Sequence, residues 1–185
     1  MNIDTNNILR HWREDVPNDR MAHLIRDTER AFRKSLQVRL ARFKVPFGHW
    51  TFLRILWQND GLTQKELSQR AGVMEPTTFA AIKAMEASGY VRRSQLPSNK
   101  KNVYVHLSAK GRALKNKLVP LAEEVNRAAV AEIPLEHIAV TRETLLSIIE
   151  NLARNEAQSQ DPEHRIPSTR ELASRVAAGS KRKRA

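Results

Sequence analysis

The segment between residues 61 and 107 constrains the fold most, because two short helix-forming runs there come before two β-prone runs. The first helical run, QKELSQRA, follows Thr63. Thr63 and Glu66 have the T-x-x-E spacing of a capping box, in which each side chain accepts a hydrogen bond from a backbone N–H at the helix start. The run ends at Gly72, and a second helical run ends at Gly89. A short helix, a tight glycine turn and a second helix predict a helix-turn-helix.

The second helix is expected to anchor itself to the module through an apolar face of Phe79, Ile82 and Met85. After it, YVRRSQ and NVYVHLS are β-prone and are joined by LPSNKK, which predicts a two-stranded hairpin. A helix-turn-helix followed by a hairpin is a winged helix.

Long helical patterns flank this module. Apolar residues recur every three or four positions over 20–43 and again over 108–133 and 134–157, while HWTFLRILWQ predicts a helix buried on most sides. Pro120 predicts a kink. The long helices are too apolar for one chain to cover, so we expect a homodimer interface.

The predicted fold class is mainly α with a small β-hairpin wing: a winged helix-turn-helix flanked by long N- and C-terminal dimerisation helices. The expected organisation is an N-terminal extension at 1–19, a helical dimerisation region at 20–46 and 108–157, a winged helix-turn-helix DNA-binding domain at 47–107, and a basic, disordered tail at 158–185.

Charge indicates the partner. The chain holds 32 Lys and Arg residues against 20 Asp and Glu residues, a net charge of +12. Such an excess favours a polyanion, and double-stranded DNA is preferred over a membrane because no strongly amphipathic surface helix rich in Lys, Trp and Phe is seen. The alternatives are a sequence-specific regulator and a sequence-tolerant architectural protein that uses the same basic surfaces and the SKRKRA tail.

Composition excludes several other classes. The 185 residues contain no cysteine, so disulfides and cysteine nucleophiles are excluded, which suits a reducing compartment. No apolar run approaches the roughly 20 residues that cross a bilayer, and the N-terminus has no apolar signal core. We therefore expect a soluble, cytoplasmic protein with no membrane partner.

Catalysis is not expected. The six histidines have neither H-x-x-x-H nor H-E-x-x-H spacing, and nucleophile-elbow, Walker and dinucleotide-binding glycine motifs are missing from the sequence. We predict no enzyme activity, no metal site and no cofactor.

Three segments together carry a family resemblance: LTQKELSQRAGVMEPTT, the HW pair of the second helix, and VYVHLSAKGRAL. With the order of elements over roughly 20–155, the chain resembles the MarR family of bacterial transcription regulators, and most closely the branch that controls operons for aromatic-acid breakdown. The resemblance implies a homodimeric repressor that binds a pseudo-palindromic operator and is released by a small aromatic acid. Benzoate-like, hydroxycinnamate-like and pyridine carboxylates, and coenzyme A thioesters, all remain open as effectors.

Recognition is expected at the start of the second helix of the helix-turn-helix. Pro76 suits a first helical turn, and Thr77 and Thr78 offer hydroxyls to phosphate and methyl groups to thymine. The alternative is that Thr77 only begins the helix and Lys83 is a solvated charge. The predicted DNA-contacting residues are Thr63, Gln64, Glu75, Pro76, Thr77, Thr78, Lys83, Arg92, Arg93, Asn99, Lys100 and Lys101.

The wing departs from the family pattern. Relatives carry an Asp followed two positions later by an Arg that enters the minor groove, and the matching positions here are Asn99 and Lys101. Lys101 supplies charge but lacks the planar fork of arginine. Arg92 and Arg93 are expected to clamp the DNA backbone, the alternative being that they only solubilise a strand edge.

The resemblance also implies an effector pocket between the first two long helices and the DNA-binding module. A small aromatic carboxylate needs flat apolar walls and one or two cationic donors. The alternatives are that Trp50 is simple core and that Arg26 serves an ion pair between helices. The predicted effector-binding residues are Met21, His23, Arg26, His49, Trp50, Arg54 and Met74.

Overall fold

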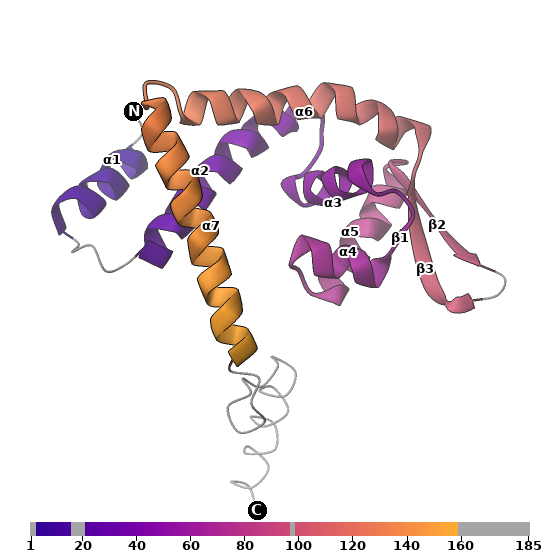
Figure 1. Cartoon of the computed structure of the whole chain (residues 1–185). Helices are drawn as coiled ribbons and strands as arrows, with labels where there is room; N and C mark the ends of the chain where they lie inside the picture. Colours follow the sequence, from indigo (N-terminus) through magenta and orange to yellow (C-terminus); the bar gives the residue numbers. More distant parts are fainter. Residues whose placement is uncertain (1–2, 16–20, 97–98, 159–185) are drawn as a thin grey trace, which may run out of the picture. The chain divides into compact units, whose positions relative to one another are not determined.

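The computed structural model describes residues 3–15, 21–96 and 99–158 (Figure 1). The chain divides into two units, one ending at Ala131 and one beginning at Glu132. The first unit contains α1 (Ile3–Arg10), a π-helical turn (His11–Asp15), α2 (Met21–Ala41), α3 (Phe47–Gln58), β1 (Leu62–Thr63), α4 (Gln64–Ala71), α5 (Glu75–Ala87), β2 (Val91–Leu96), β3 (Asn99–Leu107) and α6 (Ala109–Ala129). The second contains α7 (Leu135–Gln158).

The predicted fold class is confirmed, because the chain is mainly helical with one small antiparallel sheet. The tail expected at 158–185 lies outside the described residues except for Gln158, as do residues 1–2 and 16–19 of the expected N-terminal extension. Within the described part of the chain, no helix is long and apolar enough to cross a membrane.

The sheet has one strand more than the predicted hairpin. Its order is β1-β3-β2, and Leu62 of β1 pairs with Val105 of β3. Sequence pattern did not show β1 because it is two residues long, too short for an alternating pattern.

The helix-turn-helix forms from the predicted local signals. The Thr63 hydroxyl accepts a hydrogen bond from the Glu66 backbone N–H at 3.2 Å, and a Glu66 carboxylate oxygen accepts from the Thr63 backbone N–H at 2.8 Å, which completes the capping box. Gly72 ends α4 with φ of 63°, in the left-handed region that favours glycine. Pro76 lies in the first turn of α5, where its missing N–H costs no helical hydrogen bond.

The buried face predicted for α5 is wrong at one of its three residues, Phe79. Phe79 is 50% exposed, whereas Ile82, Met85 and Thr78 are each 0% exposed. Residues 78, 82 and 85 follow the spacing i, i+4, i+7, so Thr78 occupies the buried stripe and Phe79 falls on its flank. The helix is therefore anchored by Thr78, Ile82 and Met85.

The core of the first unit lies where α3, α4, α5 and the sheet pack against α6 and the C-terminal half of α2. Leu36 and Leu40 of α2 are buried, but Met21, Leu24 and Phe32 of its N-terminal part remain exposed. Helix α6 continues through Pro120 without a break. Helix α7, in the second unit, exposes the apolar residues Leu135, Val140, Leu145, Leu146, Ile149 and Leu152.

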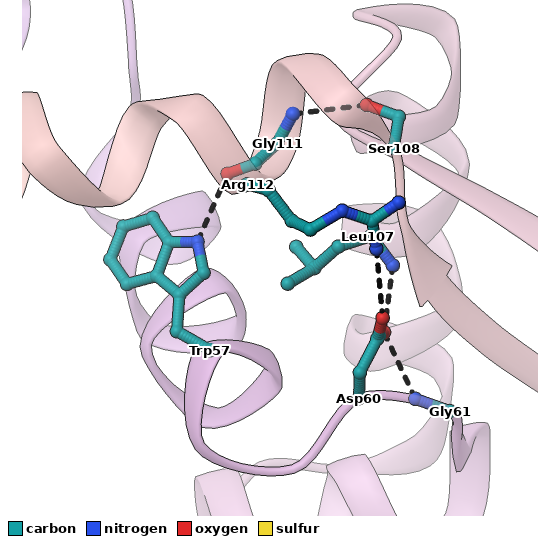
Figure 2. A network of polar contacts seen from close by, with 7 residues as sticks. All are labelled: Trp57, Asp60, Gly61, Leu107, Ser108, Gly111 and Arg112. Atoms are coloured by element: carbon teal, nitrogen blue, oxygen red, sulfur yellow. Dashed lines mark hydrogen bonds and ion pairs between the residues drawn. The ribbon is translucent and has the colours of Figure 1, made fainter.

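A polar joint ties α3 and the sheet to α6 (Figure 2). One Asp60 carboxylate oxygen accepts from the backbone N–H groups of Gly61 at 3.0 Å and Leu107 at 2.8 Å. The other oxygen pairs with Arg112 at 3.1 Å. Beside it, the Trp57 indole N–H donates to the Gly111 carbonyl at 2.9 Å. The joint fixes the corner at which the wing returns to α6.

Candidate nucleic-acid interface

The outer surface of α5 is the centre of the candidate interface. The helix packs on α4 on one side and on β2 on another, and Glu75, Pro76, Thr77 and Lys83 are exposed. These four predicted contacts are therefore available to a partner.

Thr78 is not available. Its side chain is 0% exposed, and its hydroxyl donates within the helix to the Met74 carbonyl at 3.3 Å. The structure thus places Thr78 in the core and not on the exposed surface of α5, because it lies on the stripe shared with Ile82 and Met85.

The start of α4 carries two further predicted contacts. The Thr63 hydroxyl is engaged with Glu66, and its hydrogen bonds are the largest cause that lowers the pKa of Glu66 below its ordinary value. Gln64 is half-buried, and its side-chain nitrogen has no hydrogen-bond partner among the described residues. The Thr63 hydroxyl therefore caps the N-terminus of α4. Only the backbone and the methyl group of Thr63 remain available to contact a partner.

The two wing arginines differ. Arg92 is exposed, but Arg93 is bound to Glu86 of α5: its Nε donates at 2.8 Å, its Nη2 lies at 2.6 Å, and its backbone N–H donates to the second carboxylate oxygen at 3.1 Å. The side-chain hydrogen bond from Arg93 is the largest cause that lowers the pKa of Glu86. Arg93 therefore ties the wing to α5, whereas Arg92 has no ion pair with any carboxylate of the described residues.

Near the tip of the wing, the backbone is described for Leu96 and from Asn99 onward, and residues 97–98 lie outside the described residues. Asn99 begins β3 and pairs with Leu96 across the hairpin. The side chains of three predicted DNA contacts, Asn99, Lys100 and Lys101, lie outside the described side chains, and Lys101 is the one at the position of the minor-groove arginine of relatives.

A second candidate site is a cavity of about 250 Å³ between α2, α3 and α6. Trp50 and Arg54, both predicted to bind an effector, lie in its lining. The remaining lining residues are Glu29, Phe32, Arg33, Leu36, Phe47, Thr51, Ala122, Val125 and Asn126.

The two arginines that line the cavity differ in whether a carboxylate pairs with them. Arg33 forms an ion pair with Glu29 at 2.7 Å and lies 5.2 Å from the centre of the Phe47 ring. Arg54 is exposed and has no carboxylate within ion-pair distance among the described residues. Arg54 is thus the cation that an anionic ligand can engage without competing with a protein carboxylate.

The other predicted effector residues lie elsewhere. Met21 and Met74 are exposed at 48% and 62%, and neither lines the cavity. Arg26 pairs with its neighbour Asp27 at 3.3 Å, and His23 is exposed on α2.

His49 is half-buried, 6.3 Å from the Tyr90 ring, and burial lowers its pKa. The cavity instead draws on α6, a contribution that no local pattern indicates because it depends on how α6 packs across α2 and α3. Among the described residues, no three His, Cys, Asp or Glu side chains cluster to hold a metal ion.

Residues 48–103, from the start of α3 into β3, match the model of the MarR family. The HTH-type transcriptional regulator TtmR of Methylorubrum extorquens is 33% identical over 88 residues, covering 48% of this chain and 45% of that protein. The homoprotocatechuate degradative operon repressor of Escherichia coli is 28% identical over 87 residues, covering 47% of this chain and 59% of that protein. The chain thus matches about half the length of these curated relatives.

Solved structures share the fold. A MarR transcriptional regulator from Methanosarcina mazei aligns with a TM-score of 0.67 at 20% identity, over 79% of this chain and 98% of that one. A MarR family regulator from Listeria monocytogenes, solved in complex with a 26mer DNA, aligns with a TM-score of 0.66 at 22% identity, over 80% of this chain and 98% of that one.

Proposed function

Through residues 48–103 the chain belongs to the MarR family, and we propose that it is a DNA-binding transcription regulator that represses its target as a homodimer and is released by a small aromatic acid. The observation that carries the proposal is the exposed face of α5 beside a wing, in a chain of net charge +12. A helix of this kind fits the major groove of a duplex.

DNA binding is tested by titrating the purified protein against the DNA upstream of its own gene and against a shuffled duplex of equal length. A regulator binds the upstream duplex at least about a thousandfold more tightly at physiological salt. Equal affinity for both duplexes, falling steeply with salt, would instead support the architectural alternative.

The homodimer is supported by exposed apolar residues on the described helices α2 and α7. Val38 of α2 is 63% exposed and Ile149 of α7 is also 63% exposed, in helices that carry further exposed apolar residues. Covering such residues in a symmetric interface would remove them from water. Analytical ultracentrifugation should show that the wild type is a dimer and that Ile149→Arg shifts it toward monomer. A wild type that sediments as a monomer would contradict the proposal.

The effector site is supported by the cavity between α2, α3 and α6. Its aromatic and aliphatic lining suits an aromatic ring, and Arg54, which has no ion pair among the described residues, suits the carboxylate on that ring. The name of the Escherichia coli relative refers to an operon that degrades homoprotocatechuate, an aromatic acid.

A thermal-shift screen with benzoate-like, hydroxycinnamate-like and pyridine carboxylates tests this site. The effector should raise the melting temperature of the wild type and weaken its DNA binding by about 5- to 150-fold. Arg54→Ala should abolish the thermal shift, whereas Arg26→Ala, which removes an arginine outside the cavity, should keep it. A shift retained in Arg54→Ala would move the effector away from this cavity.

A further inference from the structure

The exposed face of α5 is nearly free of the side chains that usually read bases. Pro76, Phe79, Ala80 and Lys83 follow the spacing i, i+3, i+4, i+7 and are all exposed, so they share one face. The helix, EPTTFAAIKAMEA, contains no Arg, Asn or Gln. Arg or Lys pairs with guanine and Asn or Gln with adenine through bidentate hydrogen bonds, so α5 can offer Lys83 to a guanine but has no side chain that pairs with adenine in this way.

Phe79 is the largest side chain on this face, and it is held in place. It is 50% exposed, and the guanidinium carbon of Arg93 lies 5.9 Å from the centre of its ring. Arg93 is in turn fixed by Glu86 through the contacts at 2.8 and 2.6 Å. The wing thus holds one side of the ring, which lowers the entropy that the ring would lose on binding a partner.

The surroundings point to DNA as that partner. Lys65 and Arg70 of α4 and Arg92 of β2 are exposed on the elements next to α5. An apolar face bordered by cations suits a groove floor bordered by phosphates. Within the major groove, the apolar group that a base pair presents is the C5-methyl group of thymine, and phenylalanine and alanine contact it.

We infer that α5 reads thymine methyl groups, with Phe79 as the main specificity-determining residue and Ala80 and Thr77 as smaller contacts. The inference rests on the proposed function and names thymine as the base that the regulator recognises. The operator half-site accordingly contains thymines facing α5, and Lys83 is the side chain of this face that can donate to a guanine.

The test exploits the fact that deoxyuridine differs from thymidine only by lacking the C5-methyl group. The wild type first selects its preferred duplex from a random pool, and its affinity is then measured for that duplex made with thymidine or with deoxyuridine. Each methyl group contacted should cost about fourfold in affinity when removed, the equivalent of one buried methylene. Single uridine replacements then locate the contacted thymines.

Phe79→Ala supplies the second arm of the comparison. It should bind the thymidine duplex more weakly than the wild type does and lose little further affinity on the uridine duplex. Gln58→Ala, which trims an exposed side chain at the end of α3, should keep the full methyl dependence. Thermal melting should show both variants folded, because neither side chain is in the core.

Two outcomes overturn different claims. If the wild type selects a duplex but binds its thymidine and uridine forms equally, or if Phe79→Ala remains as sensitive to the methyl groups as the wild type, thymine reading by Phe79 is wrong and the regulator stands. If the selection yields no preferred duplex, the proposed function itself fails.

Discussion

Asp60 and Arg112 are 52 positions apart in the chain, and their side chains form an ion pair at 3.1 Å where the wing returns to α6. The same Asp60 carboxylate accepts the Leu107 backbone N–H at 2.8 Å. One side chain therefore holds three segments: the end of α3, the last residue of β3 and the first turn of α6. The ion pair contributes less to stability than the hydrogen bond to Leu107, because the Arg112 side chain is 58% exposed and solvent screens its charge.

Asp60→Ala is expected to lower the free energy of unfolding by about 2 kcal/mol, because it leaves the backbone N–H of Leu107 without its carboxylate acceptor. The backbone N–H of Gly61 keeps the Val105 carbonyl as an acceptor at 3.1 Å. Arg112→Ala removes only the screened pair and should cost less than about 1 kcal/mol. Urea unfolding of the two variants measures both values. Equal losses would mean that the ion pair, and not the backbone hydrogen bonds, stabilises the joint.

Two glycines offer a matched pair of substitutions. A Cβ on Gly111 would lie 2.1 Å from the Tyr90 carbonyl oxygen, whereas a Cβ on Gly48 would meet nothing within 4 Å. Gly111→Ala should therefore destabilise the protein by about 3 kcal/mol or more, since backbone has to move. Gly48→Ala, inside α3, should stabilise it by up to about 1 kcal/mol through helix propensity. Thermal melting distinguishes the two, and a tolerated Gly111→Ala would show that α6 can shift away from Tyr90.

Local signals in the sequence were sufficient to predict the order of the helices from α2 to α7, whereas α1 lies in the segment that was expected only as an N-terminal extension. The capping box of Thr63 and Glu66, the left-handed Gly72 and the apolar periods each act within a few residues, so the boundaries of α4 and α5 followed from them. Strand β1 could not be predicted from local signals, because Leu62 and Thr63 form a strand only by pairing with β3. Joints such as that of Asp60 with Arg112 depend on tertiary packing in the same way.

The candidate site was predictable in part for the same reason. The exposed Pro76, Thr77 and Lys83 follow from their place at the start of a recognition helix. Thr78 was expected on the surface but is buried, and Phe79 was expected in the core but is exposed. The sequence misled here because an apolar residue beside a buried stripe cannot be told from a core residue by its type. The spacing of Ile82 and Met85 from position 78 was the signal that could have placed Phe79 outside.

The pair of Glu86 and Arg93 makes stability depend on pH. The pKa of Glu86 in the folded chain is lowered from its ordinary value of 4.5, chiefly by the hydrogen bond from Arg93. The ionised carboxylate therefore stabilises the fold above pH 4.5, and this contribution is lost as the pH falls through the folded-state pKa.

Glu86→Gln should accordingly be less stable than the wild type by about 1 kcal/mol at pH 7, and the difference should shrink as the pH falls below 4.5. Denaturant unfolding of both proteins between pH 7 and pH 3 measures it. A difference that stays constant over this range would show that the charge of Glu86 contributes nothing to its pairing with Arg93.

Thr77 and Thr78 are adjacent, and their different burial predicts that the same substitution weakens DNA binding at Thr77 but not at Thr78. Thr77→Val removes a hydroxyl from the exposed face and should weaken DNA binding by about fivefold, the value of one hydrogen bond near 1 kcal/mol, with stability unchanged. Thr78→Val removes a buried hydroxyl whose bond to the Met74 carbonyl is 3.3 Å long.

The Met74 carbonyl also accepts the Thr78 backbone N–H at 3.0 Å, so it keeps a donor in Thr78→Val. This variant should change stability by less than about 1 kcal/mol and leave DNA affinity as it is. Titration of the selected duplex with each variant, alongside urea unfolding, provides both readings. A loss of affinity in Thr78→Val at unchanged stability would mean that α5 turns its buried stripe outward when it binds DNA.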